Sequence, residues 1–110
     1  MSLMTWPSAA QQTRFPRLFD ETRETCVAAA AAVDGRCAMV GEAWRAAWAA
    51  DPSLALYGGD GYHPSPLGTR LAALVLYEEI TGHDARTLPT DDATTRLLQR
   101  VAHETVARAR

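Results

Sequence analysis

The sequence contains neither lysine nor asparagine, and its eleven basic residues are arginines scattered along 110 positions. Because the net charge is −2 and no basic run occurs, the chain has no evident surface for neutralising a row of phosphates, and we expect no nucleic-acid partner. The longest apolar run, Cys26–Val33, falls well short of the roughly 20 residues that cross a bilayer. We therefore expect a soluble chain with no membrane partner and leave its compartment open, with the cytoplasm as one option.

Cysteine is nearly as scarce, since only Cys26 and Cys37 are present. Two cysteines alone do not make the paired knuckles of a structural zinc site. A single disulfide is one alternative. We favour two free thiols that behave as small buried hydrophobic groups.

What the sequence does contain is the composition of a folded protein, because 47% of its residues are hydrophobic and 22% are charged. Those values argue against disorder as the default. A chain of this length holds one domain at most. No charged-then-apolar secretory leader starts it, and we interpret Met1–Leu3 as an added leader before a natural start at Met4.

Hydrophobic periodicity predicts an alternating order of strands and helices. Short apolar runs bounded by turn residues are typical of buried parallel strands. The clearest helix has Pro66 in its first turn and ends at Gly82. The predicted strands are Leu3–Trp6 and Arg36–Val40, the predicted helices are Arg14–Val33, Glu42–Ala50, Leu67–Ile80 and Asp91–Arg110, and Ser8–Thr13 is a polar connection.

One segment combines residues suited to chemistry with a rigid turn. It reads Tyr-Gly-Gly-Asp-Gly-Tyr-His-Pro-Ser-Pro-Leu-Gly and places Asp60 three residues before His63. An aspartate that accepts a hydrogen bond from histidine Nδ1 fixes the tautomer and leaves Nε2 free as a general base. We therefore predict that Asp60 and His63 form a catalytic pair. Ser65 lies nearby, but a hydroxyl just before a helix usually caps that helix, and we interpret it so.

These residues resemble the last conserved block of the SGNH hydrolases, the GDSL esterase and lipase family. Weaker similarity at Met4–Pro7 and Val40–Trp44 extends the resemblance over residues 4 to 82. The resemblance implies an α/β fold, namely the C-terminal half of a flavodoxin-like three-layer fold, rich in helix and with one or two short parallel strands. It also implies that His63 and Asp60 are two members of a Ser-His-Asp triad that acts on acyl esters.

Other parts of the family's active site have no counterpart in this sequence. The family's nucleophile lies in an N-terminal Gly-Asp-Ser block, and a glycine and an asparagine from two later blocks supply further oxyanion donors. Neither Gly-Asp-Ser nor any asparagine occurs here. We therefore expect residues 1–110 to be a partial domain that is inactive alone, and whether the chain is itself an enzyme stays open. The alternative is a non-catalytic oligomerisation or protein-interaction module derived from the same fold.

We expect neither a cofactor nor a metal ion. His83 and Asp84 follow a helix end, and a metal site that combines them with Asp60 and His63 is the disfavoured interpretation. His103, within the last predicted helix, is interpreted as a solvated or partly packed residue.

A partner is nevertheless expected from the predicted strands. Two short parallel strands without neighbours would leave hydrogen-bonding edges and an apolar face uncovered. The simplest partner is a second copy, so we predict a homodimer or higher assembly. The surfaces expected to meet are the helices Arg14–Val33 or Asp91–Arg110, or the strand edges.

Overall fold

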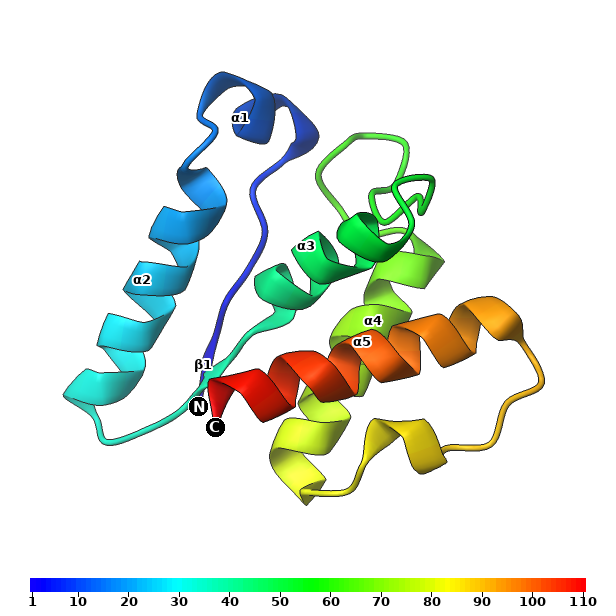
Figure 1. Ribbon diagram of the computed structural model, residues 1–110. Coiled ribbons are helices and arrows are strands. Elements are labelled where there is room, and N and C mark those ends of the chain that lie inside the picture. The colour runs from blue at the N-terminus through cyan, green and yellow to red at the C-terminus, as the bar shows by residue number, and fades with distance from the viewer.

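Two short parallel strands lie among five α-helices in the computed structural model, which describes residues 1–110 (Figure 1). In chain order the elements are β1 (Ser2–Leu3), α1 (Ala9–Arg14), α2 (Leu18–Ala32), β2 (Cys37–Ala38), α3 (Val40–Ala50), α4 (Pro66–Thr81), the 3₁₀ helix η1 (Ala85–Thr87) and α5 (Ala93–Ala109). The prediction of a helix-rich chain with a short parallel sheet is confirmed.

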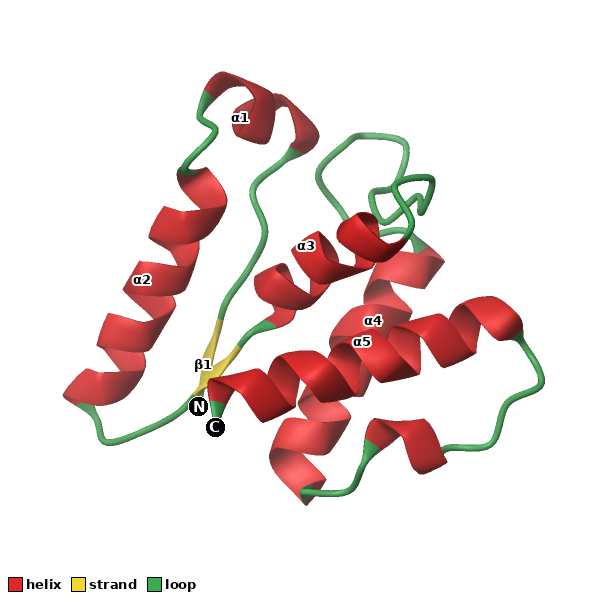
Figure 2. Ribbon diagram, viewed as in Figure 1, coloured by secondary structure: helices red, strands yellow, loops and turns green.

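The sheet consists of β1 and β2 alone, with Ser2 opposite Cys37 and Leu3 opposite Ala38. Helices α1 and α2 connect the two strands, and β2 leads directly into α3. Figure 2 shows the strands between α2 on one side and the group of α3, α4 and α5 on the other. One edge of β1 therefore pairs with β2, and its other edge pairs with no strand. β1 itself falls on residues that the sequence assigned to a leader.

The first helix was not predicted, because Ser8–Thr13 was expected to be a polar connection. The Ser8 hydroxyl accepts a hydrogen bond from the Gln11 backbone N–H, and the Gln11 side chain accepts one from the Ser8 N–H. This reciprocal pair is a capping box, which satisfies two N–H groups that have no partner within the helix. It starts α1 in a stretch with no buried residue.

The predicted helix Arg14–Val33 is shorter than expected and begins at Leu18. Phe15 lies outside the helical region, with φ −126° and ψ 84°. The residue before a proline is sterically pushed out of the helical region, and Pro16 has this effect on Phe15. Proline therefore separates α1 from α2 instead of lying within the first turn of one helix.

The prediction of two free thiols is wrong, because Cys26 and Cys37 form a disulfide with a Cα–Cα distance of 5.8 Å. Cys26 lies on the face of α2 that covers the sheet, and Cys37 lies in β2. The two cysteines belong to the smaller of two buried clusters, formed by Met4, Phe19, Cys26, Ala30 and Cys37. The bridge therefore fastens α2 to the strands.

The larger core lies between α3, α4 and α5, which match their predicted ranges closely. Trp44 is completely buried there, as its place in the predicted helix indicated. Helix α4 starts with Pro66 after the cap Ser65 and ends at Gly82, whose φ of 73° is left-handed. The core consists of Val40, Ala43, Trp44, Ala47, Leu56, Leu71, Leu74, Val75, Ala85, Leu98, Val101, Ala102 and Val106.

Candidate active site

The loop between α3 and α4 folds back on itself and presents Asp60 and His63 at its tip. Tyr57 and Pro64 form an isolated antiparallel bridge, and the Gly58 N–H donates to the His63 carbonyl at 2.7 Å. Gly61 adopts a φ of 68°, a left-handed conformation that glycine reaches without strain. The backbone bridge, the backbone hydrogen bond and the conformation of Gly61 therefore fix the shape of the loop.

Asp60 and His63 share the hydrogen bond that the sequence predicted. His63 Nδ1 lies 2.5 Å from Asp60 Oδ2, and Asp60 Oδ1 accepts the backbone N–H groups of Tyr62 and His63, both at 2.9 Å. The hydrogen bond from the His63 side chain, aided by the two backbone donors, lowers the pKa of Asp60 to about 2. Asp60 is therefore a carboxylate at neutral pH, and Nε2 is the ring nitrogen of His63 that this contact leaves free.

Contacts with the N-terminal segment hold the loop in place. Trp6 Nε1 donates to the Tyr62 carbonyl at 3.0 Å, and the Ala9 N–H donates to the Gly61 carbonyl at 2.8 Å. The Tyr57 hydroxyl donates to a carbonyl of the same segment. The loop therefore lies against the chain that leaves the carboxyl end of β1.

His63 lines a shallow hollow of about 220 Å³. Its side chain is 72% exposed and that of Asp60 is 52% exposed, so water reaches both groups. The hollow is lined by Thr5, Trp6, Tyr62, His63 and Pro64. No serine is among these residues, so this lining does not supply the serine hydroxyl of a Ser-His-Asp triad.

Three of the four serines already serve local structure. Ser65 caps α4, because its hydroxyl accepts the Gly68 N–H at 3.1 Å while it donates to the Ala55 carbonyl at 2.6 Å. Ser8 caps α1, and the Ser53 hydroxyl donates to the Asp51 carboxylate. The interpretation of Ser65 as a helix cap is confirmed.

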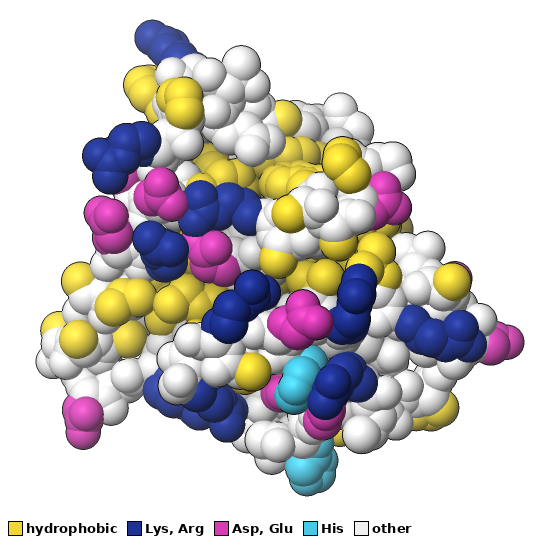
Figure 3. All heavy atoms as spheres, viewed as in Figure 1, with side chains coloured by type: hydrophobic (Ala, Val, Ile, Leu, Met, Phe, Trp, Pro, Cys, Tyr) yellow, Lys and Arg dark blue, Asp and Glu magenta, His cyan; other side chains and the backbone are white.

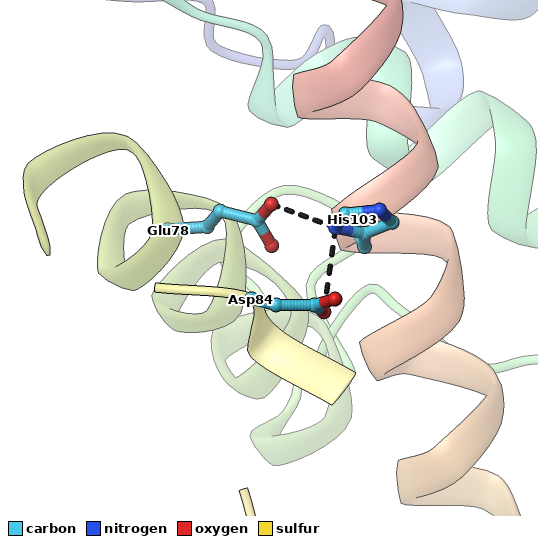
Figure 4. A group of neighbouring side chains, drawn as sticks. All are labelled: Glu78, Asp84 and His103. Carbon is cyan, nitrogen blue, oxygen red and sulfur yellow. Dashed lines mark hydrogen bonds and ion pairs between the residues drawn. The ribbon is translucent and has the colours of Figure 1, made fainter. Parts of the chain in front are cut away.

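A second group of titratable side chains gathers elsewhere, and we call Glu78, Asp84 and His103 the polar cluster (Figure 4). His103 Nδ1 lies 2.7 Å from Glu78 Oε1 and 3.3 Å from Asp84 Oδ1. Hydrogen bonds from the Arg86 side chain and backbone lower the pKa of Asp84 to about 2, so this carboxylate is ionised. Figure 3 shows histidine among acidic and basic side chains on this face of the molecule.

The polar cluster was not predicted from the sequence. The disfavoured metal site combined His83 and Asp84 with Asp60 and His63, whereas the structure brings Asp84 to Glu78 and His103. One signal was present: Glu78 follows Leu71 and Leu74 at helical spacing, so a carboxylate continues an apolar face of α4. A buried carboxylate needs a partner, and His103 on α5 is that partner.

Comparison of the chain with protein-family models, with curated proteins and with solved structures finds no match. None of its helices combines the length and the apolar character needed to cross a membrane.

Proposed function

We propose that this chain is the C-terminal segment of an SGNH-type serine ester hydrolase, with His63 as general base and acid and Asp60 as the residue that orients it. The observation that carries the proposal is the contact between His63 Nδ1 and Asp60 Oδ2, in a loop whose residues resemble the family's last block. Asp60 Oδ1 is already occupied by two backbone N–H groups, so the carboxylate cannot turn away easily.

In the proposed reaction, His63 Nε2 accepts the proton of a serine hydroxyl as the serine oxygen attacks the carbonyl carbon of an acyl ester. The imidazolium then returns this proton to the departing alcohol. Water releases the acyl group by the same route, with His63 again taking and returning a proton. Asp60 stays ionised throughout and stabilises the imidazolium, as its low pKa allows.

The serine and the oxyanion donors would come from another polypeptide segment, and the open edge of β1 is where we propose that it pairs. Leu3 is 44% exposed, and a hollow of about 360 Å³ runs between this edge and α2. Thr5 lines both this hollow and the one beside His63. The carboxyl end of β1 leads to Thr5, which lines the hollow beside His63, so a parallel strand added at this edge would also end there. Ligand sites of parallel sheets lie at such carboxyl ends.

With such strands added, β1 and β2 would form one side of a flavodoxin-like sheet. By itself the chain should be inert, because nucleophilic attack and stabilisation of the oxyanion both need groups outside it. We further propose that the working form resides in an oxidising compartment, where a disulfide such as Cys26–Cys37 persists.

The alternative function is a non-catalytic oligomerisation or interaction module, with a homodimer as its simplest form. The same open edge supports it, together with the exposed side chains of Leu3, Val27 and Val33. In that case the Asp60–His63 contact is a structural turn. Size-exclusion chromatography with light scattering tests the homodimer, and a monomer at micromolar concentration would contradict it.

Serine labelling with a fluorophosphonate tests the hydrolase proposal, alongside hydrolysis of p-nitrophenyl acetate. The isolated chain should show neither. The genomic sequence upstream of the region that encodes this chain should encode a Gly-Asp-Ser block, and co-expression of that segment should restore labelling and turnover. His63→Ala should abolish both, whereas His83→Ala, a change of another exposed histidine, should leave both intact. Labelling of the isolated chain, or equal activity of the His63→Ala complex, would refute the proposal.

A further inference from the structure

We propose that the polar cluster of Glu78, Asp84 and His103 is a binding site for Zn²⁺. The site is separate from the Asp60–His63 pair and does not depend on the hydrolase proposal. Its donor residues belong to three parts of the fold: Glu78 lies in α4, Asp84 is the N-cap of η1, and His103 lies in α5. Figure 4 shows the two carboxylates pointing toward the same ring nitrogen.

The spacing of the donor atoms fits one small cation. Zinc with ligands at about 2.0 to 2.1 Å holds them about 3.3 Å apart when tetrahedral and about 2.9 Å apart when octahedral. The distance from His103 Nδ1 to Asp84 Oδ1 is 3.3 Å, and that to Glu78 Oε1 is 2.7 Å. One donor of each residue lies within 4.8 Å of the others. Measured from His103 Nδ1, zinc therefore needs Glu78 Oε1 to withdraw by about 0.2 to 0.6 Å, whereas Asp84 Oδ1 already lies at the tetrahedral spacing.

Neighbouring donors hold both carboxylates in this orientation. Glu78 Oε2 accepts the Ala85 N–H at 2.9 Å, and this leaves Oε1 directed at the ring. Asp84 Oδ2 accepts Arg86 Nη2 at 2.7 Å. Asp84 Oδ1 accepts the backbone N–H and the Nε–H of Arg86 at 2.8 and 3.0 Å, and these bonds hold it 3.3 Å from His103 Nδ1. Hydrogen bonds of this kind fix metal ligands and typically affect affinity about 10- to 100-fold.

Charge and access also suit a divalent ion. Two carboxylates and a neutral imidazole offer a charge of −2, of which the Arg86 guanidinium hydrogen-bonded to Asp84 offsets one unit. Imidazole favours zinc over Mg²⁺ or Ca²⁺, which prefer oxygen donors alone. The side chains of His103 and Asp84 are 24% and 29% exposed, so water can reach the remaining coordination positions. Zinc would take the place of the hydrogen atom between His103 Nδ1 and the carboxylate oxygens, so the ring would bind it as the Nε2–H tautomer.

The test is calorimetric titration of the chelator-treated chain with ZnCl₂, with MgCl₂ as a comparison. We expect one Zn²⁺ per chain and no comparable heat from MgCl₂. His103→Gln retains a hydrogen-bond donor for Glu78 but removes the imidazole, so zinc affinity should fall at least about 100-fold. His83→Ala and His63→Ala remove the only other histidines and should leave affinity unchanged.

Three results would overturn the proposal: no zinc binding by the wild-type chain, unchanged affinity in His103→Gln, or loss of binding in His63→Ala or His83→Ala. Circular dichroism checks that each variant is folded. If His103→Gln is unfolded, Asp84→Asn takes its place, because asparagine can still cap η1 but lacks the charge. Its zinc affinity should fall at least about 10-fold, and an unchanged value would contradict the site.

Discussion

Removal of the Cys26–Cys37 bridge should lower the free energy of unfolding by about 3 kcal/mol. The bridge spans 11 positions of sequence, and closing a loop of that length removes roughly this much conformational freedom from the unfolded chain at 25 °C. A domain of this size has a total stability of about 5 to 15 kcal/mol. The bridge is therefore a large part of what keeps the chain folded.

The assay is urea denaturation of the oxidised wild-type chain, the same chain with a phosphine reductant, and the double variant Cys26→Ala/Cys37→Ala. With a urea dependence of about 1 to 3 kcal/mol per molar, the midpoint should fall by about 1 to 3 M in both altered forms. The reductant should not affect the double variant. Hydrogen exchange should rise first in α2, because the bridge fastens that helix to β2.

Equal midpoints for oxidised and reduced wild-type protein would refute this reasoning. So would the detection of two free thiols by alkylation and mass measurement of the unreduced, denatured chain. Either result would favour free thiols at Cys26 and Cys37, as predicted from the sequence.

Two further predictions concern the loop that carries Asp60 and His63 and the first turn of α4, which packs against it. Gly68→Ala would place a Cβ 2.3 Å from the Leu56 carbonyl oxygen, and we expect a loss of about 1 to 3 kcal/mol in thermal or urea unfolding. Gly59→Ala meets no atom within 4 Å and should change little; equal effects would contradict the packing argument. Because the pKa of Asp60 lies near 2 instead of 3.8, its stabilising contacts should be complete above the ordinary value and be lost as pH falls through about 2. An NMR titration of the His63 ring should show this acid step, Asp60→Asn should remove it, and a step near pH 4 in the wild type would argue against the contact.

Local signals explain why α4 could be predicted from sequence. Ser65 supplies the cap, Pro66 has the backbone angle of a first helical residue, and Gly82 provides the left-handed end. Each signal acts within a few residues, so no knowledge of the fold is needed. The same holds for the Asp60–His63 contact, which joins residues three positions apart.

The missed features depend on packing between distant segments. The disulfide forms because α2 lies across β2, and periodicity shows only that Cys26 belongs to an apolar face. The polar cluster needs α4 and α5 to cross so that Glu78 meets His103, 25 positions further along the chain. Proline was misjudged at Pro16 because its effect on the preceding residue was stronger than the helical pattern around it.

The three tryptophans of the chain form one aromatic group. Trp6 stacks on Trp44 with ring centroids 4.4 Å apart, and Trp48 meets Trp44 edge-on at 5.7 Å. Because Trp6 also donates to the Tyr62 carbonyl, intrinsic emission from this protein reports on the junction between the N-terminal segment and the histidine loop. A red shift would reveal release of that segment while far-UV signals from the helices stayed constant. Tryptophan fluorescence therefore offers an intrinsic probe of conformational change beside the proposed active site.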